Sequence, residues 1–169
     1  RALIEKGVAC YVLDGDNVRH GLNCNLGFAP EDREENVRRL GEVAKLFAEQ
    51  GVIALVSLIS PYRGDRDKVR ARLGEGEFVE IFMKIPLEVC EERDPKGLYK
   101  AVRAGKIKGF TGVDAPYEEP LEPEITVTAQ NDAGERTSVE DMATQIVGYL
   151  GQNGYLHSPV RPGEWVKTD

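Results

Sequence analysis

Several ionisable side chains follow directly after a short apolar run near the start of the chain. The run Val8–Leu13 leads into the segment Asp14–Leu22, which contains two carboxylates, an amide and an arginine. In open α/β sheets, ligands bind at the edge formed by the C-terminal ends of the strands. If the strand continues that far, Asp14 and Asp16 face the same side and converge on one ligand. A carboxylate placed there can accept a proton from an attacking hydroxyl or hold a water on Mg²⁺.

The same residues have a second interpretation, a tight turn without chemistry. Asp-Gly, here Asp14-Gly15, is a common turn dipeptide, and on its own the pattern gives the two interpretations equal weight. Arg19 favours an anion-binding site, because a guanidinium group carries a planar fork of donors that matches phosphate or sulfate.

A second group of candidate residues lies at the start of a predicted helix. Apolar residues at helical spacing, a proline in the first turn and a glycine just past the end predict this helix over Pro30–Gln50. Arg33 and Asn36 lie three residues apart on one face near its N-terminal end, where the partial positive charge of a helix favours anions. A surface ion pair with Glu31 or a neighbouring residue is the alternative for Arg33.

Two further residues have both a structural and a functional interpretation. Phe28, in the loop before this helix, is either a core residue or a platform on which a flat ring stacks. Ser60 follows the apolar run Val52–Leu58, again at the C-terminal end of a predicted strand. Ser60 either contacts a ligand or caps the next helix, and the pattern alone favours the cap.

The segment from Asp94 to Glu124 is rich in lysine, arginine, glycine and proline, and poor in apolar residues. A segment of this length within a compact domain suggests a functional lid. Glycines and Phe110 alternate with the charges, which is typical of a loop that closes on a charged aromatic ligand and excludes water. A solvated charged face is the alternative. The basic residues are Lys96, Lys100, Arg103, Lys106 and Lys108.

Four apolar runs predict the β-strands: Val8–Leu13, Val52–Leu58, Phe78–Ile85 and Ile125–Thr128. The first three are nearly continuous, as in strands buried on both faces of a parallel sheet. Helices are expected over Pro30–Gln50, Arg66–Leu73 and Pro86–Arg93, and after Ser138, which forms a capping-box pattern with Asp141. This alternation predicts an α/β fold with a central parallel sheet flanked by helices.

Composition narrows the function classes. The 169 residues suit one domain, and the net charge of −7 argues against a nucleic-acid-binding surface. The three cysteines include no C-x-x-C pair, which argues against a disulfide scaffold or a zinc ribbon. The two histidines, His20 and His157, are too few for a histidine-rich metal site. No apolar stretch approaches the roughly 20 residues of a membrane span. A reduced intracellular compartment is therefore expected, with no metal-ligating residues assigned.

One expected motif is missing from the sequence. The sequence contains no Gly-x-x-x-x-Gly-Lys-Ser/Thr phosphate loop. The candidate binding segments described above are nevertheless of the kind that function next to such a loop. Arg1–Gly7 is interpreted as the last turns of a helix. We therefore expect the natural protein to extend upstream, with a first strand and a phosphate loop that this sequence does not contain.

Six segments, in order along the chain, resemble the adenylyl-sulfate kinase family, P-loop kinases of sulfate assimilation. The likeness runs from about Gly7 to Tyr155 and is greatest toward the plant and algal branch. It predicts a kinase-like domain over 1–155 and a C-terminal extension over 156–169. The six segments are Leu13–Asn23, Asn25–Phe28, Asp32–Asn36, Ile59–Tyr62, Asp94–Lys100 and Ile107–Gly112.

The resemblance implies a three-layer P-loop kinase-type fold with a basic lid. It implies transfer of the γ-phosphoryl group of ATP, with Mg²⁺, to the 3′-hydroxyl of adenosine 5′-phosphosulfate (APS). It further implies a homodimer in the cytoplasm or plastid stroma. Two alternatives stay open: a non-catalytic nucleotide-sulfate binding domain that lacks the phosphate loop, and a P-loop kinase for another small molecule.

The resemblance also assigns roles by position. Asp16 is the candidate to orient or deprotonate the 3′-hydroxyl. Ser60 matches a serine discussed in this family as a phosphoryl acceptor, although direct in-line transfer is favoured. Phe28 and Phe110 are expected to sandwich the substrate adenine. The remaining substrate contacts are expected to be Asn17, Arg19, Arg33, Asn36, Ile59, Lys96 and Gly109, and the lid residues Lys100, Arg103, Lys106 and Lys108.

Overall fold

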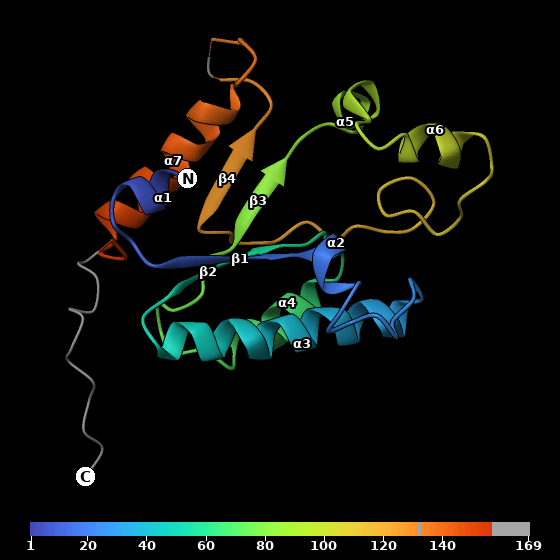
Figure 1. Cartoon of the computed structure of the whole chain (residues 1–169). Coiled ribbons are helices and arrows are strands. Elements are labelled where there is room, and N and C mark those ends of the chain that lie inside the picture. The colour runs from blue at the N-terminus through green and yellow to red at the C-terminus, as the bar shows by residue number, and fades with distance from the viewer. Residues whose placement is uncertain (132, 157–169) are drawn as a thin grey trace.

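The computed structural model describes residues 1–131 and 133–156 (Figure 1). All but the first residue of the predicted C-terminal extension, 156–169, lies outside the described residues. Within the described ranges, strands alternate with helices in the order α1 (Ala2–Glu5), β1 (Cys10–Asp14), α2 (Gly15–Val18), α3 (Pro30–Glu49), β2 (Ile53–Ser57), α4 (Arg63–Arg70), β3 (Ile81–Lys84), α5 (Leu87–Arg93), α6 (Leu98–Arg103), β4 (Ile125–Thr128) and α7 (Val139–Gln152).

The strands form two parallel pairs. β1 pairs with β2 from Cys10 opposite Ile53, and β3 pairs with β4 from Ile81 opposite Ile125. The predicted α/β fold with parallel strands is confirmed. The expected single sheet is seen as two separate pairs, because β2 and β3 form no ladder with each other within the described residues.

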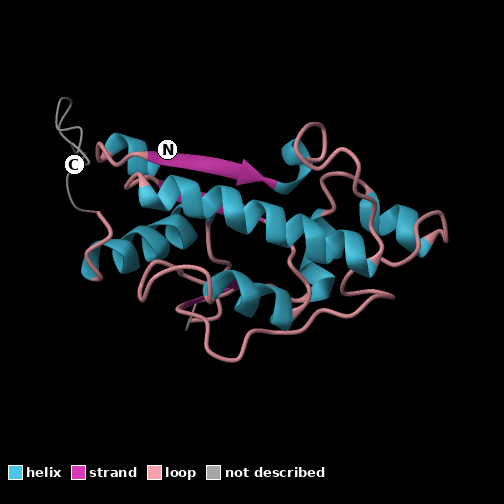
Figure 2. Cartoon of the chain, turned by 90° about the horizontal axis from the view of Figure 1, so that it is seen from below, coloured by secondary structure: helices cyan, strands magenta, loops and turns pink. Residues whose placement is uncertain are grey.

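Helices lie on both sides of the strands and supply the core. α3 and α4 pack together on one side, and Figures 1 and 2 show α3 along the β1–β2 pair. Leu40 of α3 is fully buried, and the rings of Tyr11 and Phe47 stack with centroids 4.9 Å apart. On the other side α7 packs against β4, where Val127 and Met142 are buried. This packing on both sides holds the strand pairs in place, and with them the edge formed by the C-terminal ends of β1 and β2.

The end of β1 differs from the expectation that Asp14 and Asp16 share one strand face. The strand stops at Asp14, whose carboxylate caps α2 by accepting hydrogen bonds from the amides of Asp16 and Asn17 at 2.9 and 3.2 Å. A short side chain at a helix N-cap satisfies otherwise unpaired amides. Asp14 is therefore a structural cap, and Asp16 lies on α2.

The expected lid contains a helix that the sequence pattern did not predict. α6 begins after Gly97, whose φ of 67° lies in the left-handed region that glycine adopts freely. The carboxylate of Asp94 accepts hydrogen bonds from the amides of Tyr99 and Lys100, each at 3.1 Å. The lid is thus partly ordered by its own backbone contacts.

The predicted capping box of α7 is confirmed. Ser138 Oγ accepts a hydrogen bond from the Asp141 amide at 3.0 Å, and the Asp141 carboxylate accepts one from the Ser138 amide at 3.3 Å. We predict that Ser138→Ala lowers the free energy of unfolding by about 1 kcal/mol, measured by urea denaturation. Ser138→Asn, which keeps a capping oxygen, serves as the control; equal stability of the alanine variant and the unsubstituted chain contradicts the prediction.

Candidate functional site

Loops that are distant in sequence meet at the C-terminal ends of β1 and β2. Figure 1 shows α2 after β1 on the same side of the molecule as α5, α6 and the segment that follows them. Hydrogen bonds from Arg33 and an ion pair between Lys96 and Asp16 connect these loops.

Arg33, in the first turns of α3, joins two of the loops. Its Nε donates to the carbonyl oxygen of Phe28 at 2.8 Å, while Nη2 donates to that of Gly109 at 2.7 Å and Nη1 to Thr111 Oγ1 at 2.7 Å. The alternative of a surface ion pair with Glu31 is wrong. One guanidinium group therefore holds the loop that carries Phe28 beside the lid segment that carries Phe110.

Phe28 is an exposed platform and not a core residue. Its side chain is 69% exposed, which excludes the core interpretation. The guanidinium carbon of Arg19 lies 4.3 Å from the ring centroid, within cation–π range. Arg19 Nη1 also donates to the carbonyl oxygens of Leu26 and Gly27 at 3.0 and 2.8 Å. Arg33 also lies over this ring, with its guanidinium carbon 6.0 Å from the centroid. Arg19 therefore fixes both the loop and the ring.

A charged contact connects the lid to α2. The ammonium group of Lys96 forms an ion pair with the carboxylate of Asp16, and both side chains are exposed. The hydrogen bond to Asp16 raises the pKa of Lys96. An exposed ion pair is worth little free energy, so a ligand group that reaches Asp16 can exchange with Lys96 at small cost.

Asp114 is a site residue that the sequence analysis missed. Its carboxylate accepts hydrogen bonds from the amides of Gly109 and Phe110 at 2.8 and 2.5 Å, which fixes the backbone beneath the Phe110 ring. The ring itself meets Tyr99 edge-on, with centroids 5.1 Å apart. The only signal in the sequence is an aspartate that follows a glycine at a short spacing, a pattern too common to interpret.

Ser60 adopts a rare backbone conformation. Its φ of 37° is positive and lies in the left-handed region, which residues with a side chain rarely adopt. Such strain in a side-chain-bearing residue is concentrated at functional sites. The helix that follows begins after Tyr62 without a side-chain cap, so the capping interpretation of Ser60 is wrong.

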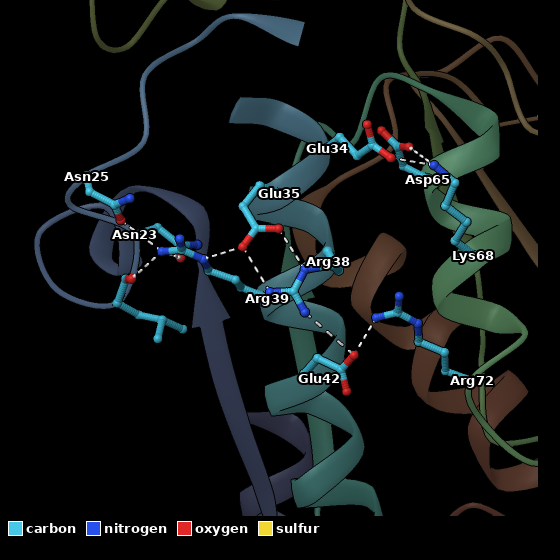
Figure 3. A network of polar contacts seen from close by, with 11 residues as sticks. Asn23, Asn25, Glu34, Glu35, Arg38, Arg39, Glu42, Asp65, Lys68 and Arg72 are labelled. Carbon is cyan, nitrogen blue, oxygen red and sulfur yellow. Dashed lines mark hydrogen bonds and ion pairs between the residues drawn. The ribbon is translucent and has the colours of Figure 1, made fainter. Parts of the chain in front are cut away.

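Asn36 lies beneath the site in a buried contact. Its side chain is 6% exposed and accepts a hydrogen bond from Asn23 at 2.9 Å, and Asn23 is fully buried. In the network of Figure 3, Arg39 Nη1 donates to the Leu22 carbonyl at 3.1 Å and to Asn25 Oδ1 at 2.8 Å. Asn36 and Arg39 therefore attach the loop before Phe28 to α3, and direct substrate contact by Asn36 stays a prediction.

Glu35 orients Arg39, which attaches the loop before Phe28 to α3. Its carboxylate accepts hydrogen bonds from Arg38 and Arg39 at 2.6 and 2.8 Å, and these lower its pKa to about 2 (Figure 3). Since a lowered carboxyl pKa preserves the ionised form, this contact is lost only as the pH falls toward 2. Glu35 therefore keeps its charge throughout the neutral and mildly acidic range.

The basic lid residues differ in their surroundings. Arg103 pairs with Glu91 of α5 at 2.5 Å, which offsets its charge. Lys100, Lys106 and Lys108 are exposed and form no ion pair within the described part of the chain. Asn17 and Ile59 are also exposed, and the Asn17 side chain makes no hydrogen bond to a described residue. The roles of all of these residues stay predictions.

Comparison with known proteins identifies the family. The sequence model named Adenylylsulphate kinase matches residues 1–128. The chain is 62% identical over 156 residues to adenylyl-sulfate kinase 1, chloroplastic, of Arabidopsis thaliana, covering 92% of this chain and 55% of that protein. It is 60% identical over 150 residues to the adenylyl-sulfate kinase of Staphylococcus carnosus, covering 89% and 73%.

The chain belongs to the adenylyl-sulfate kinase family. A solved structure supports the same assignment: the APS kinase CysC of Mycobacterium tuberculosis, in complex with AMPPNP and APS, is 47% identical with a TM-score of 0.81, covering 89% of this chain and 85% of that one. The predicted family and the predicted P-loop kinase-type fold are confirmed. The chain spans about half the length of the first four curated relatives, which are all named chloroplastic.

The family implies two further groups, a Mg²⁺ ion and the phosphates of ATP. Within the described residues, no group of three or more histidine, cysteine, aspartate or glutamate side chains is placed to hold a metal ion. The sequence also lacks the phosphate-loop motif. No described residue is therefore assigned to Mg²⁺ or to the phosphates of ATP. Among the described helices, none combines the length and apolar character needed to cross a membrane.

The Asp114 contact generates a prediction. Asp114→Asn removes one of two acceptor oxygens, and we expect the amides of Gly109 and Phe110 to exchange hydrogen about three- to tenfold faster. The hydrogen bonds from the Gly109 and Phe110 amides lower the pKa of Asp114 from its ordinary value, so the contact persists until the pH falls through that lowered pKa. Exchange is measured by NMR at neutral pH.

The control for this experiment is Glu122→Gln. Glu122 is an exposed carboxylate near the end of the same segment and makes no side-chain hydrogen bond to a described residue. Equal exchange in Asp114→Asn and the control shows that Asp114 does not order the loop.

Proposed function

We propose that this chain forms the APS-binding part of an adenylyl-sulfate kinase, which transfers the γ-phosphoryl group of ATP to the 3′-hydroxyl of APS. The observation that carries the proposal is the Arg33 contact, which gathers the loops of Phe28 and Phe110 at one strand edge. The family assignment supports the reaction type, and the APS named in the related M. tuberculosis structure supports the substrate.

The proposed substrate has a flat ring and two anionic groups, and the site offers a partner for each. The exposed face of Phe28 and the ring of Phe110 stack on the adenine. Arg19 and Arg33 lie beside them and attract the phosphosulfate, because each keeps its positive charge while its donors hold backbone carbonyls. The proposed pocket is completed by Asn17, Asn36, Ile59, Ser60, Lys96 and Gly109.

The proposed chemistry depends mainly on position and charge. In phosphoryl transfer the protein contributes orientation and electrostatic stabilisation more than covalent chemistry. Asp16 orients the 3′-hydroxyl or accepts its proton, after Lys96 has moved from the carboxylate. The lid, with Lys100, Arg103, Lys106 and Lys108, excludes water, which is a competing acceptor. In-line transfer needs no covalent step at Ser60, whose proposed role is to shape the pocket.

ATP and Mg²⁺ belong to the proposed reaction, but no residue named here is assigned to them. We further propose a homodimer, by family resemblance, and a location in the plastid stroma or the cytoplasm. The chloroplastic names of the plant relatives and the bacterial origin of others are consistent with either location.

A nucleotide-sulfate binding function without catalysis is the alternative to the kinase. Isothermal titration calorimetry with APS, together with an assay for ADP release, separates the two candidates. Binding with ADP release supports the kinase, and binding without ADP release supports the second candidate. Failure to bind APS contradicts both.

The Arg33 contact predicts a loss of affinity. We expect Arg33→Ala to weaken APS binding by about 1.5–3 kcal/mol, because a hydrogen bond to a charged group is lost and the two loops separate. Arg38→Ala is the matched control, since Arg38 lies on the same helix and, among the described residues, forms ion pairs only with Glu35 and Glu42. Equal affinities of the two variants, measured by calorimetry, would remove Arg33 from the site.

Asp16 has a different expected signature. Asp16→Asn keeps the size of the side chain and removes its basicity, so turnover should fall by at least about 100-fold while APS affinity changes little. The assay compares ADP release with calorimetric affinity in the same preparation. A proportional loss of both quantities would make Asp16 a binding residue instead.

A further inference from the structure

A buried arginine holds the strained Ser60 from behind. Arg66 of α4 is 7% exposed, and each end of its guanidinium group contacts a different segment. Nη1 donates to the carbonyl oxygen of Ser60 at 2.7 Å, and Nη2 donates to that of Glu118 at 2.7 Å. Nε donates to the carboxylate of Glu80, just before β3, at 2.6 Å. Arg66 therefore joins three segments that are far apart in sequence.

The contact with Ser60 explains how its backbone conformation persists. A positive φ is unfavourable for a residue with a side chain and is maintained only where the surroundings determine it. The Ser60 carbonyl faces a charged donor that is itself fixed by the Glu80 carboxylate at 2.6 Å. Charge-assisted hydrogen bonds of this kind are about twice as strong as neutral ones. Without Arg66, the peptide at Ser60 is free to relax.

The contact with Glu118 is part of the attachment of the lid. The Glu118 amide donates to the Pro61 carbonyl at 2.8 Å, and its carboxylate accepts from the Arg63 amide at 2.7 Å. The C-terminal end of the lid is thereby attached to the segment that begins with Ser60. Arg66 contacts both segments of this junction, at Ser60 and at Glu118, so the relative position of the two segments depends on Arg66.

We propose that Arg66 is a positioning residue for the substrate site. It sets the backbone of Ser60 and the C-terminal anchor of the lid together, although it is buried and reaches no substrate itself. This inference rests on the proposed function, because it assumes that the pocket beside Ser60 receives APS. Its consequence is that loss of the Arg66 fork weakens substrate binding more than it weakens the fold.

Arg70 provides a matched control one helical turn further along α4. It pairs with Glu124 at 2.5 Å and approaches the same Glu80 carboxylate at 3.5 Å. It contacts neither Ser60 nor Glu118 through any hydrogen bond in the described residues. Replacement of either arginine by lysine keeps the charge beside Glu80, but only Arg66→Lys breaks the junction.

The experiment compares Arg66→Lys and Arg70→Lys in the full chain. Calorimetry gives the APS affinity, thermal unfolding gives the stability, and hydrogen exchange reports on residues 58–63 and 117–119. We expect Arg66→Lys to lower the affinity about tenfold and to speed exchange in both segments, as expected when one charged hydrogen bond is lost. Arg70→Lys should change the affinity by less than about twofold while lowering the unfolding temperature to a similar extent.

Two results would overturn the proposal. One is an unchanged APS affinity in Arg66→Lys. The other is a loss of affinity that follows the unfolding temperature equally in both variants, which would make Arg66 merely structural. If the unsubstituted chain does not bind APS, the proposed function has failed. If the chain and Arg66→Lys bind APS equally well, only the role of Arg66 has failed.

A second variant covers the case in which Arg66→Lys does not fold. Glu80→Gln keeps an oxygen that accepts from Arg66 but removes the charge that orients the guanidinium group. We expect a smaller loss of affinity in the same direction, about threefold, with faster exchange at residues 58–63. Affinity and exchange that match those of the unsubstituted chain would contradict the role of Arg66.

Discussion

The hydrogen bonds from arginine side chains to loop carbonyl groups are the interactions on which the site depends. The loops that form it lie outside the strands, so their carbonyl oxygens have no ladder partners. A guanidinium group presents five donors in one plane and can satisfy several such oxygens at once. Arg19, Arg33 and Arg66 each do so, for Gly27, Gly109 and Ser60 among others. The strand pairs provide the edge, and these arginines hold the loops against it.

This arrangement has a consequence for recognition of anions. An arginine already fixed to backbone oxygens loses little side-chain freedom when a ligand arrives, and such preorganisation lowers the cost of binding. The Lys96–Asp16 contact is of another kind, because both side chains are exposed and easily exchange partners. The site therefore combines a fixed part, built on α3 and α4, with an exchangeable contact between the lid and α2.

The sequence predicted the elements that depend on local patterns. The apolar run Ile125–Thr128 is β4 with the same bounds, and the Ser138 capping box begins α7 as expected. It did not predict α2, because a single hydrogen-bonding choice by Asp14 replaced an extended strand end with a helix. It also could not find the partners of Arg33 and Arg66, since contacts to carbonyl oxygens 76 or 52 residues away leave no residue-type signature.

The distribution of charge gives the proposed basic lid a physical role. The chain as a whole carries a net charge of −7, so its long-range field repels an anionic substrate. Screening limits that repulsion to distances of about 8 Å at physiological ionic strength, and within this range local charges dominate. Arg103 contributes little because Glu91 offsets it, whereas Lys100, Lys106 and Lys108 keep their charge exposed. Under the proposed function, attraction of the substrate is expected to depend on the lid, and its orientation on the arginines that hold the loops beside the lid. Evolutionary gain or loss of acidic residues elsewhere on the surface would alter the rate of encounter without altering the geometry in which the ligand is held.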